Sequence, residues 1–159
     1  MYRSVLRELL ATVPPCTSSE HPHALFMHCT TGNNRTGVFI SLLLLLLDVP
    51  HDIVCKEYAL SEQGLAPTRH LNVERLLKKG AFAGYGPERA RLKCERMIGA
   101  REESMRALIE EVNQRWGGPR GYFKGEVGLT DKEIQMLRTV MTVEEDVSED
   151  VPPRGPENR

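Results

Sequence analysis

A run of apolar residues in the first third of the chain constrains the fold most. Residues 38–47 read VFISLLLLLL and include six consecutive leucines, Leu42 to Leu47. A helix that spans a bilayer needs about 20 apolar residues, and this run ends at Asp48, so it is too short to cross a membrane. A helix that is apolar on all sides is buried on all sides. The sequence therefore predicts a central buried helix.

Helical periodicity covers most of the remaining sequence. Apolar residues recur at helical spacing from about residue 2 to 13, before Pro14 and Pro15. The same periodicity predicts helices over roughly 36–47, 50–61, 69–79, 87–98, 101–116 and 119–126. A last helix begins at Thr130, which forms a capping box with Glu133. This helix is predicted to bury four apolar residues: Ile134, Leu137, Val140 and Met141.

The size and charge of the chain limit its organisation and its partners. The 159 residues, 40% of them apolar, suffice for one domain with a hydrophobic core. The 21 Lys and Arg nearly balance the 22 Asp and Glu, which argues against nucleic acid or an anionic membrane as the main partner. Charged residues near the N-terminus disfavour a signal peptide. We expect a domain at 1–143 and an acidic, disordered tail at 144–159.

The cysteines indicate the compartment and argue against a metal site. Cys16, Cys29, Cys55 and Cys94 form no CxxC pair, so neither a disulfide scaffold nor a zinc ribbon is expected. The order HxHxxxxHC at 21–29 matches no common zinc spacing. We therefore expect a cytoplasmic protein without a metal or another cofactor.

A phosphate-binding loop is predicted between a strand and the leucine-rich helix. Residues 24–29, ALFMHC, form a short apolar run that predicts a buried strand. The residues TTGNNRTG follow directly and lead into the helix. A tight loop at the start of a helix directs several backbone N–H groups to one point and makes a nest for a tetrahedral anion. Gly32 permits the turn.

Two side chains of this loop carry the predicted chemistry. Cys29 lies at the base of the nest, where backbone amides and the helix dipole favour the thiolate, which is a nucleophile. Arg35 has a planar guanidinium that binds two phosphate oxygens and binds the transition state more strongly. The spacing matches the HCxxGxxR[ST] signature of cysteine-dependent phosphatases. This full signature disfavours the alternative that Cys29 is an inert buried thiol.

Four segments together resemble the fungal and bacterial tyrosine-protein phosphatase family, whose loop has the form HCxAGKDRTG. They are HCTTGNNRTGV at 28–38, EYALS at 57–61, RWGGPRGY at 115–122 and GLTDKEI at 128–134. The resemblance implies an α/β cysteine-dependent phosphatase domain that hydrolyses phosphate monoesters through a phosphocysteine. The implied substrates are phosphotyrosine proteins, with dual specificity or phosphoinositides as alternatives.

The family's N-terminal strands have no counterpart before Ala24. We therefore expect a helix-rich domain with an incomplete parallel sheet, corresponding to the C-terminal part of the usual domain. A fragment, a truncated product and a divergent protein that covers the strand in another way are the alternatives. An open edge of the strand at 24–28 predicts self-association.

The resemblance implies a role for each loop residue. Cys29 is the nucleophile and Arg35 binds the phosphate and stabilises the transition state. His28 and Thr36 tune the thiolate by hydrogen bonding. Backbone amides of six residues are expected to hold the phosphate: Thr30, Thr31, Gly32, Asn33, Asn34 and Arg35. No metal is needed, because Arg35 and the amides supply the positive charge.

Asn33 and Asn34 depart from the family pattern, which has Lys-Asp at these positions. The change removes a positive charge and a carboxyl group that can act as general acid. A catalytically inactive module that binds phosphoproteins without turnover is therefore the alternative function. A rhodanese-like sulfurtransferase is a third reading, which Gly32 and the Arg35-Thr36 pair disfavour.

Residues outside the loop give weaker signals. Tyr58, Arg69 and Tyr85 are candidates for the mouth of the pocket. Five basic residues are expected to lie on solvated helix faces: Lys78, Lys79, Arg89, Arg91 and Lys93. The alternative is that they form a basic rim that attracts an anionic substrate.

Overall fold

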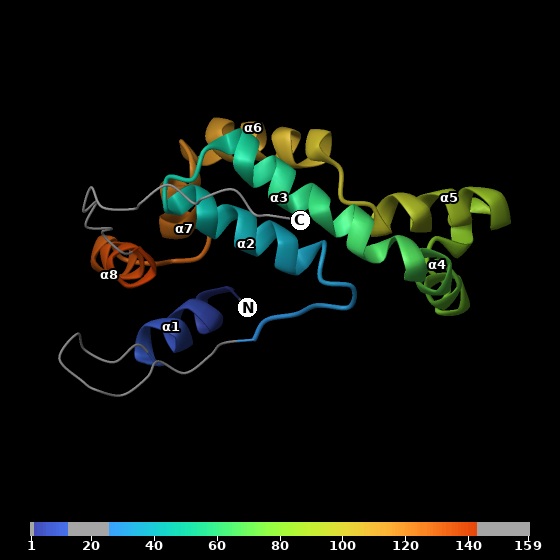
Figure 1. The fold of residues 1–159 in the computed structure, drawn as a ribbon, viewed down its shortest axis with the longest axis horizontal. Coiled ribbons are helices and arrows are strands. Elements are labelled where there is room, and N and C mark those ends of the chain that lie inside the picture. The colour runs from blue at the N-terminus through green and yellow to red at the C-terminus, as the bar shows by residue number, and fades with distance from the viewer. Residues whose placement is uncertain (1, 13–25, 143–159) are drawn as a thin grey trace, which may run out of the picture.

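The structure is a computed structural model that describes residues 2–12 and 26–142 (Figure 1). Its elements are α1 (Tyr2–Thr12), α2 (Arg35–Leu46), α3 (His51–Leu65), η1 (Ala66–Thr68), α4 (Arg69–Lys78), η2 (Ala83–Tyr85), α5 (Pro87–Ile98), α6 (Glu102–Trp116), α7 (Pro119–Gly125) and α8 (Asp131–Met141). Each helix that the sequence predicts is confirmed, with ends that differ by a few residues.

The leucine-rich helix α2 is the centre of the larger part of the molecule, which we call the body (α1, α2, α3, α6, α7 and α8). Helix α2 packs against α3 and α7, and α6 packs against both of these helices. Four of its leucines are at most 5% exposed: Leu42, Leu43, Leu45 and Leu46. Leu44 and Leu47 are partly exposed. The prediction of a buried central helix is thus confirmed for most of its circumference.

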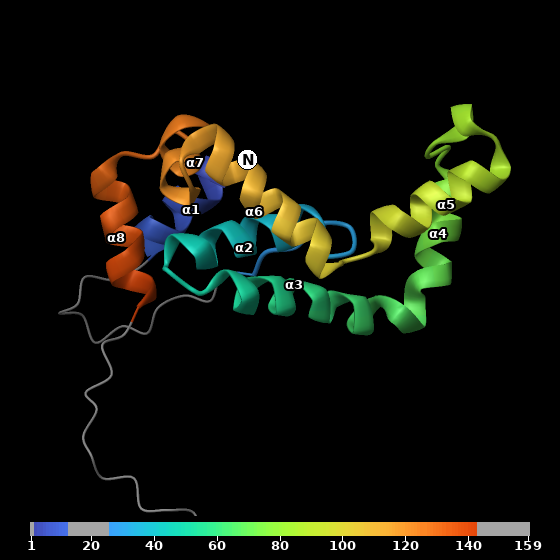
Figure 2. The ribbon, with the colours of Figure 1, turned by 90° about the horizontal axis from the view of Figure 1, so that it is seen from above.

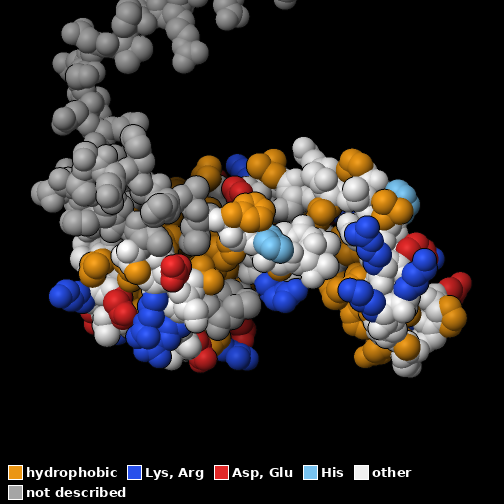
Figure 3. All heavy atoms as spheres, turned by 90° about the horizontal axis from the view of Figure 1, so that it is seen from below, with side chains coloured by type: hydrophobic (Ala, Val, Ile, Leu, Met, Phe, Trp, Pro, Cys, Tyr) orange, Lys and Arg blue, Asp and Glu red, His pale blue; other side chains and the backbone are white. Residues whose placement is uncertain are grey.

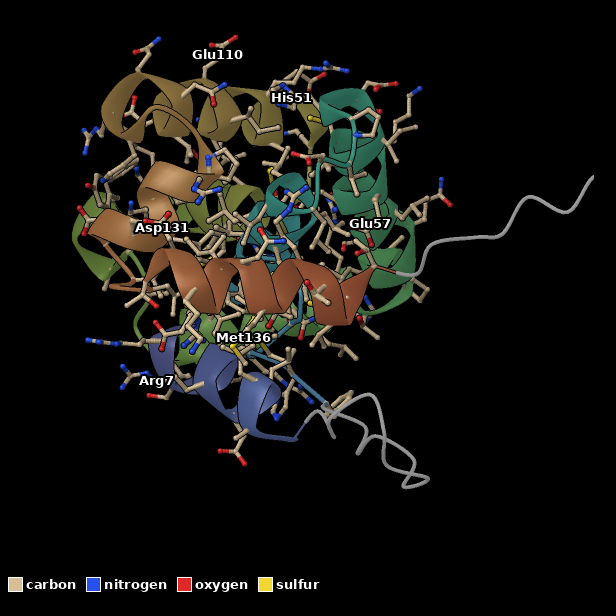
Figure 4. All side chains as sticks on the ribbon, turned by 90° about the vertical axis from the view of Figure 1, so that its left-hand side faces the viewer. Arg7, His51, Glu57, Glu110, Asp131 and Met136 are labelled. Carbon is tan, nitrogen blue, oxygen red and sulfur yellow. The ribbon has the colours of Figure 1, made fainter. Side chains whose placement is uncertain are left out.

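Helices α1 and α8 pack against each other at one end of the body (Figure 4). The predicted capping box is present: the Glu133 N–H donates to Thr130 Oγ1 at 3.2 Å, and the Thr130 N–H donates to Glu133 Oε2 at 2.8 Å. Ile134 and Leu137 of α8 are fully buried, whereas Val140 and Met141 are 38% and 39% exposed. The predicted burial of these last two residues is wrong, because the last turn of α8 carries little of the core packing.

Helices α4 and α5 pack together as a hairpin, which we call the arm (η1, α4, η2 and α5). The arm projects from the end of α3, and the chain returns to the body at the start of α6 (Figure 2). Its own core contains three buried residues, Val73, Cys94 and Ile98. The arm is therefore a separate, smaller packing unit.

Glu62 of α3 lies where the arm joins the body. Its Oε2 accepts a hydrogen bond of 2.6 Å from the backbone N–H of Ala100, just after the arm. Its Oε1 pairs with Arg69, the first residue of α4. The hydrogen bond from Ala100, followed by the bond and charge of Arg69, lowers the pKa of Glu62 below its usual value. One carboxylate thus connects both ends of the arm to α3.

The strand predicted at 24–29 is not confirmed. Residues 26–29 form no strand, and no residue of the two described ranges belongs to a sheet. Phe26 is 86% exposed, while Met27 packs partly against the body. A lone extended segment cannot form a ladder, because its backbone groups need a neighbouring strand. The described fold is helix-rich, and it offers no strand edge to support the predicted self-association.

Several sequence predictions fall outside the described residues. These include the acidic tail at 144–159, Cys16 and the histidines at 21 and 23. None of the helices formed by residues 2–12 and 26–142 has the length and apolar content that crossing a bilayer requires.

Candidate active site

The predicted phosphate loop lies at the start of α2. Gly32 has φ +83°, a left-handed conformation that other residues adopt at a cost. Asn34 is the N-cap of α2, and its carbonyl accepts a hydrogen bond of 2.8 Å from the N–H of Val38. The first N–H groups of α2 have no partner within the helix. They lie at the end of the loop that begins at Cys29, where they can bind an anion.

Cys29 carries an activated thiol. Burial alone raises the pKa of a thiol, but here hydrogen bonds to the sulfur outweigh it. The bonds come from the backbone N–H and hydroxyl of Thr36 and from the N–H groups of Gly32 and Thr31, and they lower the pKa of Cys29 from about 9 to about 6. Cys29 is therefore mostly a thiolate at neutral pH.

Two other predicted residues lie beside Cys29. Arg35 is exposed and its Nη2 donates to the hydroxyl oxygen of Thr30 at 3.2 Å. His28 Nδ1 donates to the backbone carbonyl of Cys29 at 2.9 Å, and its ring stacks on Phe26. His28 therefore contacts the backbone of Cys29, whereas Thr36 contacts the sulfur. Of the four predicted catalytic residues, His28 and Thr36 thus contact Cys29, and Arg35 lines the same cavity as Cys29.

Asn33 and Asn34 join the loop to the arm. Asn33 is 1% exposed, and its Nδ2 donates to the carbonyls of Ile98 at 2.7 Å and Gly99 at 3.4 Å. Its Oδ1 accepts a hydrogen bond from the hydroxyl of Thr31. Asn34 Nδ2 donates to the carbonyl of Met97 at 2.6 Å. Both amides thus bind the end of α5, and the Asn33 side chain is buried rather than directed to a phosphate.

A cavity of about 680 Å³ separates the loop from the arm. Figure 3 shows this face, with the notch between the body and the arm and with Lys and Arg side chains on the arm. The loop contributes Cys29, Thr30, Thr31, Asn34 and Arg35, and the arm contributes Asn72, Arg75, Leu76, Lys79, Met97 and Ile98. No Asp or Glu of the described ranges lines it. The cavity is cationic on both sides.

The arm residues are the part of the site that the sequence analysis missed, except for Lys79. Asn72, Arg75, Leu76 and Lys79 have the spacing of one helix face. That spacing was a signal for a shared face, but nothing in the sequence directs this face toward the loop. Only the path of the chain through α3 and α4 does so.

The three candidates for the mouth of the pocket lie elsewhere. Tyr58 is buried against Gly37 of α2, where an added Cβ would lie 2.9 Å from the Tyr58 ring. Arg69 pairs with Glu62. Tyr85 lies near the tip of the arm, with Lys93 Nζ 4.3 Å from the centre of its ring. None of the three lines the cavity, so this prediction is wrong.

Comparisons with known proteins find relatives that cover most of the chain. The family model described as "Tyrosine phosphatase family" matches residues 1–143. A tyrosine-protein phosphatase of Nostoc commune is 29% identical over 125 residues, which are 76% of this chain and 40% of that protein. The triple specificity protein phosphatase PtpB of Mycobacterium tuberculosis is 23% identical over 119 residues, 72% of this chain and 42% of that protein. The chain spans about two fifths of the length of these curated relatives.

Proposed function

Because the chain belongs to the tyrosine phosphatase family, we propose that it hydrolyses phosphate monoesters through Cys29, with phosphotyrosine in proteins as the substrate. The observation that carries the proposal is the lowered pKa of Cys29, about 6, in a loop that also holds Arg35 at the cavity. An ionised thiol beside a guanidinium and several backbone N–H groups suits attack on a bound phosphate.

The reaction has two steps. In the first, the Cys29 thiolate attacks phosphorus, an S–P bond forms, and the bond from phosphorus to the tyrosyl oxygen breaks. The phenolate leaves with the electron pair and takes a proton from water. In the second, water attacks the phosphocysteine, a P–O bond forms, and the S–P bond breaks. Inorganic phosphate and the thiolate result, and the proton released neutralises the hydroxide from the first step.

The surrounding residues act on the charges of these steps. Arg35 and the loop amides bind the equatorial phosphate oxygens, where negative charge spreads in the transition state. The Thr36 hydroxyl bonds the sulfur and stabilises the thiolate as it leaves phosphorus in the second step. His28 positions the Cys29 backbone through its carbonyl.

Turnover of p-nitrophenyl phosphate tests the proposal. The wild type should hydrolyse it, Cys29→Ser should not, and Arg35→Lys should lose most of the rate because an ammonium cannot replace the bidentate guanidinium. Arg89→Lys, at an exposed arginine that does not line the cavity, is the matched control and should retain the wild-type rate. Equal rates for Cys29→Ser and the wild type would overturn the proposal.

Binding of phosphoproteins without turnover is the second candidate. The observation that favours it is the lack of a carboxyl group among the described residues that line the cavity, together with the hydrogen bond from Asn34 to the carbonyl of Met97.

Without a general acid, the rate should depend steeply on the leaving group. The proposed enzyme should therefore cleave nitrophenyl phosphate far better than phenyl phosphate. A chain that binds a phosphotyrosine peptide but cleaves neither ester would support the second candidate.

The proposal also covers the bounds of the domain, the alternative substrate class and the cellular location. We infer that the described helices belong to an α/β cysteine-dependent phosphatase domain over 1–143, followed by an acidic tail at 144–159. Phosphoinositides are the alternative substrate class. A cytoplasmic location suits the free thiols of Cys29, Cys55 and Cys94, because the reaction requires Cys29 to stay reduced.

A further inference from the structure

We propose that Arg75 and Lys79 of the arm bind a second anionic group on the substrate, which we infer to be a phosphotyrosine peptide with a carboxylate or a second phosphate near the phosphotyrosine. This inference rests on the proposed function and specifies its substrate. Both residues line the cavity opposite the phosphate loop. They are four positions apart on α4 and its C-terminal end, so they lie on one face.

The size of the cavity is the first observation. Its volume, about 680 Å³, lies within the range of sites that enclose a drug-sized ligand. A phosphate in the loop occupies only the end lined by Cys29 and Arg35. The remaining space, walled by the arm, has room for the rest of a phosphotyrosyl side chain and for a neighbouring group of the peptide.

The charge of the cavity is the second observation. Arg69 and Arg91 of the same arm form ion pairs with Glu62 and Glu74. Within the described residues, Arg75 and Lys79 form no ion pair, and no acid lines the cavity with them. Arg35 and the loop amides already provide for the phosphate that is cleaved. Two more cations at the opposite wall attract a second negative group.

The apolar part of the lining indicates the kind of substrate. Leu76, Met97 and Ile98 contribute to the same cavity as the two cations. An aromatic ring gains from apolar contact, whereas an inositol ring with its several hydroxyl groups does not. The lining therefore favours a phosphotyrosyl peptide over an inositol phosphate.

Rates on three peptides of equal length test the inference. The first has phosphotyrosine among neutral residues, the second adds glutamates beside it, and the third adds a phosphoserine. An exposed ion pair changes binding by up to roughly fivefold. Arg75 and Lys79 together should therefore give the charged peptides a preference in kcat/KM on the order of tenfold. The second and third peptides distinguish a carboxylate from a phosphate as the group that is bound.

The double variant Arg75→Gln/Lys79→Gln should lose this preference. The control Lys78→Gln/Arg89→Gln removes the same charge from exposed positions of the arm that do not line the cavity, and it should keep the preference. The preference of the wild type for the charged peptides should also decrease as the salt concentration rises from 50 to 300 mM. This measurement does not depend on the folding of any variant. Equal rates of the wild type on all three peptides, or an equal loss in the control, would overturn the inference.

Two further measurements separate the possible failures. If the wild type does not hydrolyse p-nitrophenyl phosphate, the proposed catalysis fails, and the affinities of the same peptides for the wild type and both variants test the second subsite alone. A preference that is lost in Arg75→Gln/Lys79→Gln supports it, and equal affinities overturn it. If a soluble inositol polyphosphate competes more strongly than the charged peptides, the assignment to a peptide is overturned.

Discussion

The body and the arm contribute differently to stability and to the site. The body contains six helices, with α2 at their centre, and most of the buried residues described, whereas the arm buries Val73, Ala90, Cys94 and Ile98. Yet the cavity is lined about equally by the two parts. The body carries the nucleophile and Arg35, and the arm carries the opposite wall. The chemistry is thus built on the part with the larger core, and the surface proposed to contact the rest of the substrate is built on the part with the smaller core.

Three polar side chains connect the two parts. Asn33 and Asn34 of the loop bind carbonyls at the end of α5, and Glu62 of α3 binds both ends of the arm. These bonds fix the distance between the nucleophile and the arm wall without a large apolar interface. The family pattern that the resemblance implies has Lys-Asp at these positions, and here the Asn33-Asn34 pair supplies amide donors for this connection. The same departure that removes a carboxyl group from the loop thus has a structural role.

The largest effect should come from the core of the body. Phe123 of α7 is fully buried in the main cluster. Phe123→Ala should reduce the free energy of unfolding by about 3–5 kcal/mol, because the removed ring leaves a cavity. Urea unfolding measures this loss, which should appear as one cooperative transition of the whole chain. A loss confined to the arm would contradict the division that we draw.

A change in the core of the arm should act locally. Val73 is 2% exposed, and Val73→Ala removes two methyl groups, which should destabilise the arm by about 1.5–3 kcal/mol. Amide hydrogen exchange should therefore accelerate in α4 and α5 but stay slow in α2 and α6. The division between body and arm would be wrong if exchange accelerated equally in all four helices.

The helices were predictable because their signals are local. The capping box at Thr130 and the apolar run at 38–47 each specify an element from neighbouring residues alone. The run at 24–29 has the composition of a strand, but a strand also needs a partner, and residues 26–29 have none among the described residues. Composition could not supply that information.

The site was predictable on one side only. The phosphate loop is contiguous in sequence, so its signature brings Cys29, Arg35 and Thr36 together. The opposite wall comes from residues about 40 to 70 positions later, such as Arg75 and Met97. Their place depends on the length of α3 and on the turn into α4, which are tertiary properties. The hydrogen bond from Asn33 to the carbonyl of Ile98 could not be predicted for the same reason.

The attachment of the arm should depend on Glu62. Glu62→Ala leaves the N–H of the buried Ala100 without its acceptor, which should cost about 1–3 kcal/mol and accelerate exchange near both ends of the arm. Glu62→Gln is the matched control, because its amide oxygen can still accept this bond, and it should cost less. Equal effects of the two variants would show that the hydrogen bond to Ala100 contributes little.

The same carboxylate predicts a dependence on pH. Because the folded state lowers the pKa of Glu62, its contribution is present above the usual carboxyl pKa, about 4.3, and is lost as the pH falls through the lowered value. The protection of amides near the ends of the arm, measured relative to the intrinsic exchange rate at each pH, should fall only in acid, and Glu62→Gln should remove that part of the pH dependence. A loss of protection between pH 6 and 8 would point to another group.

The smallest effect concerns the ionisation of Cys29, and it tests whether the body alone sets the pKa of the nucleophile. Alkylation of Cys29 by iodoacetamide, followed by mass spectrometry of its peptide, should rise with pH to a plateau with a midpoint near 6, because only the thiolate reacts. Thr36→Val removes one of the bonds to the sulfur and should move the midpoint upward, toward the ordinary thiol value. The backbone bonds remain, so the shift should be partial. Cys55 and Cys94, whose pKa values burial raises, should react far more slowly in the wild type.

The bonds that lower the pKa of Cys29 come from Thr31, Gly32 and Thr36, which all belong to the loop of the body. Val73→Ala should therefore leave the midpoint unchanged even though it loosens the arm. If it moves the midpoint as far as Thr36→Val does, the arm holds the loop in its thiolate-stabilising conformation through Asn33. The nucleophile would then depend on both parts of the molecule, and the assignment of the chemistry to the body alone would be wrong.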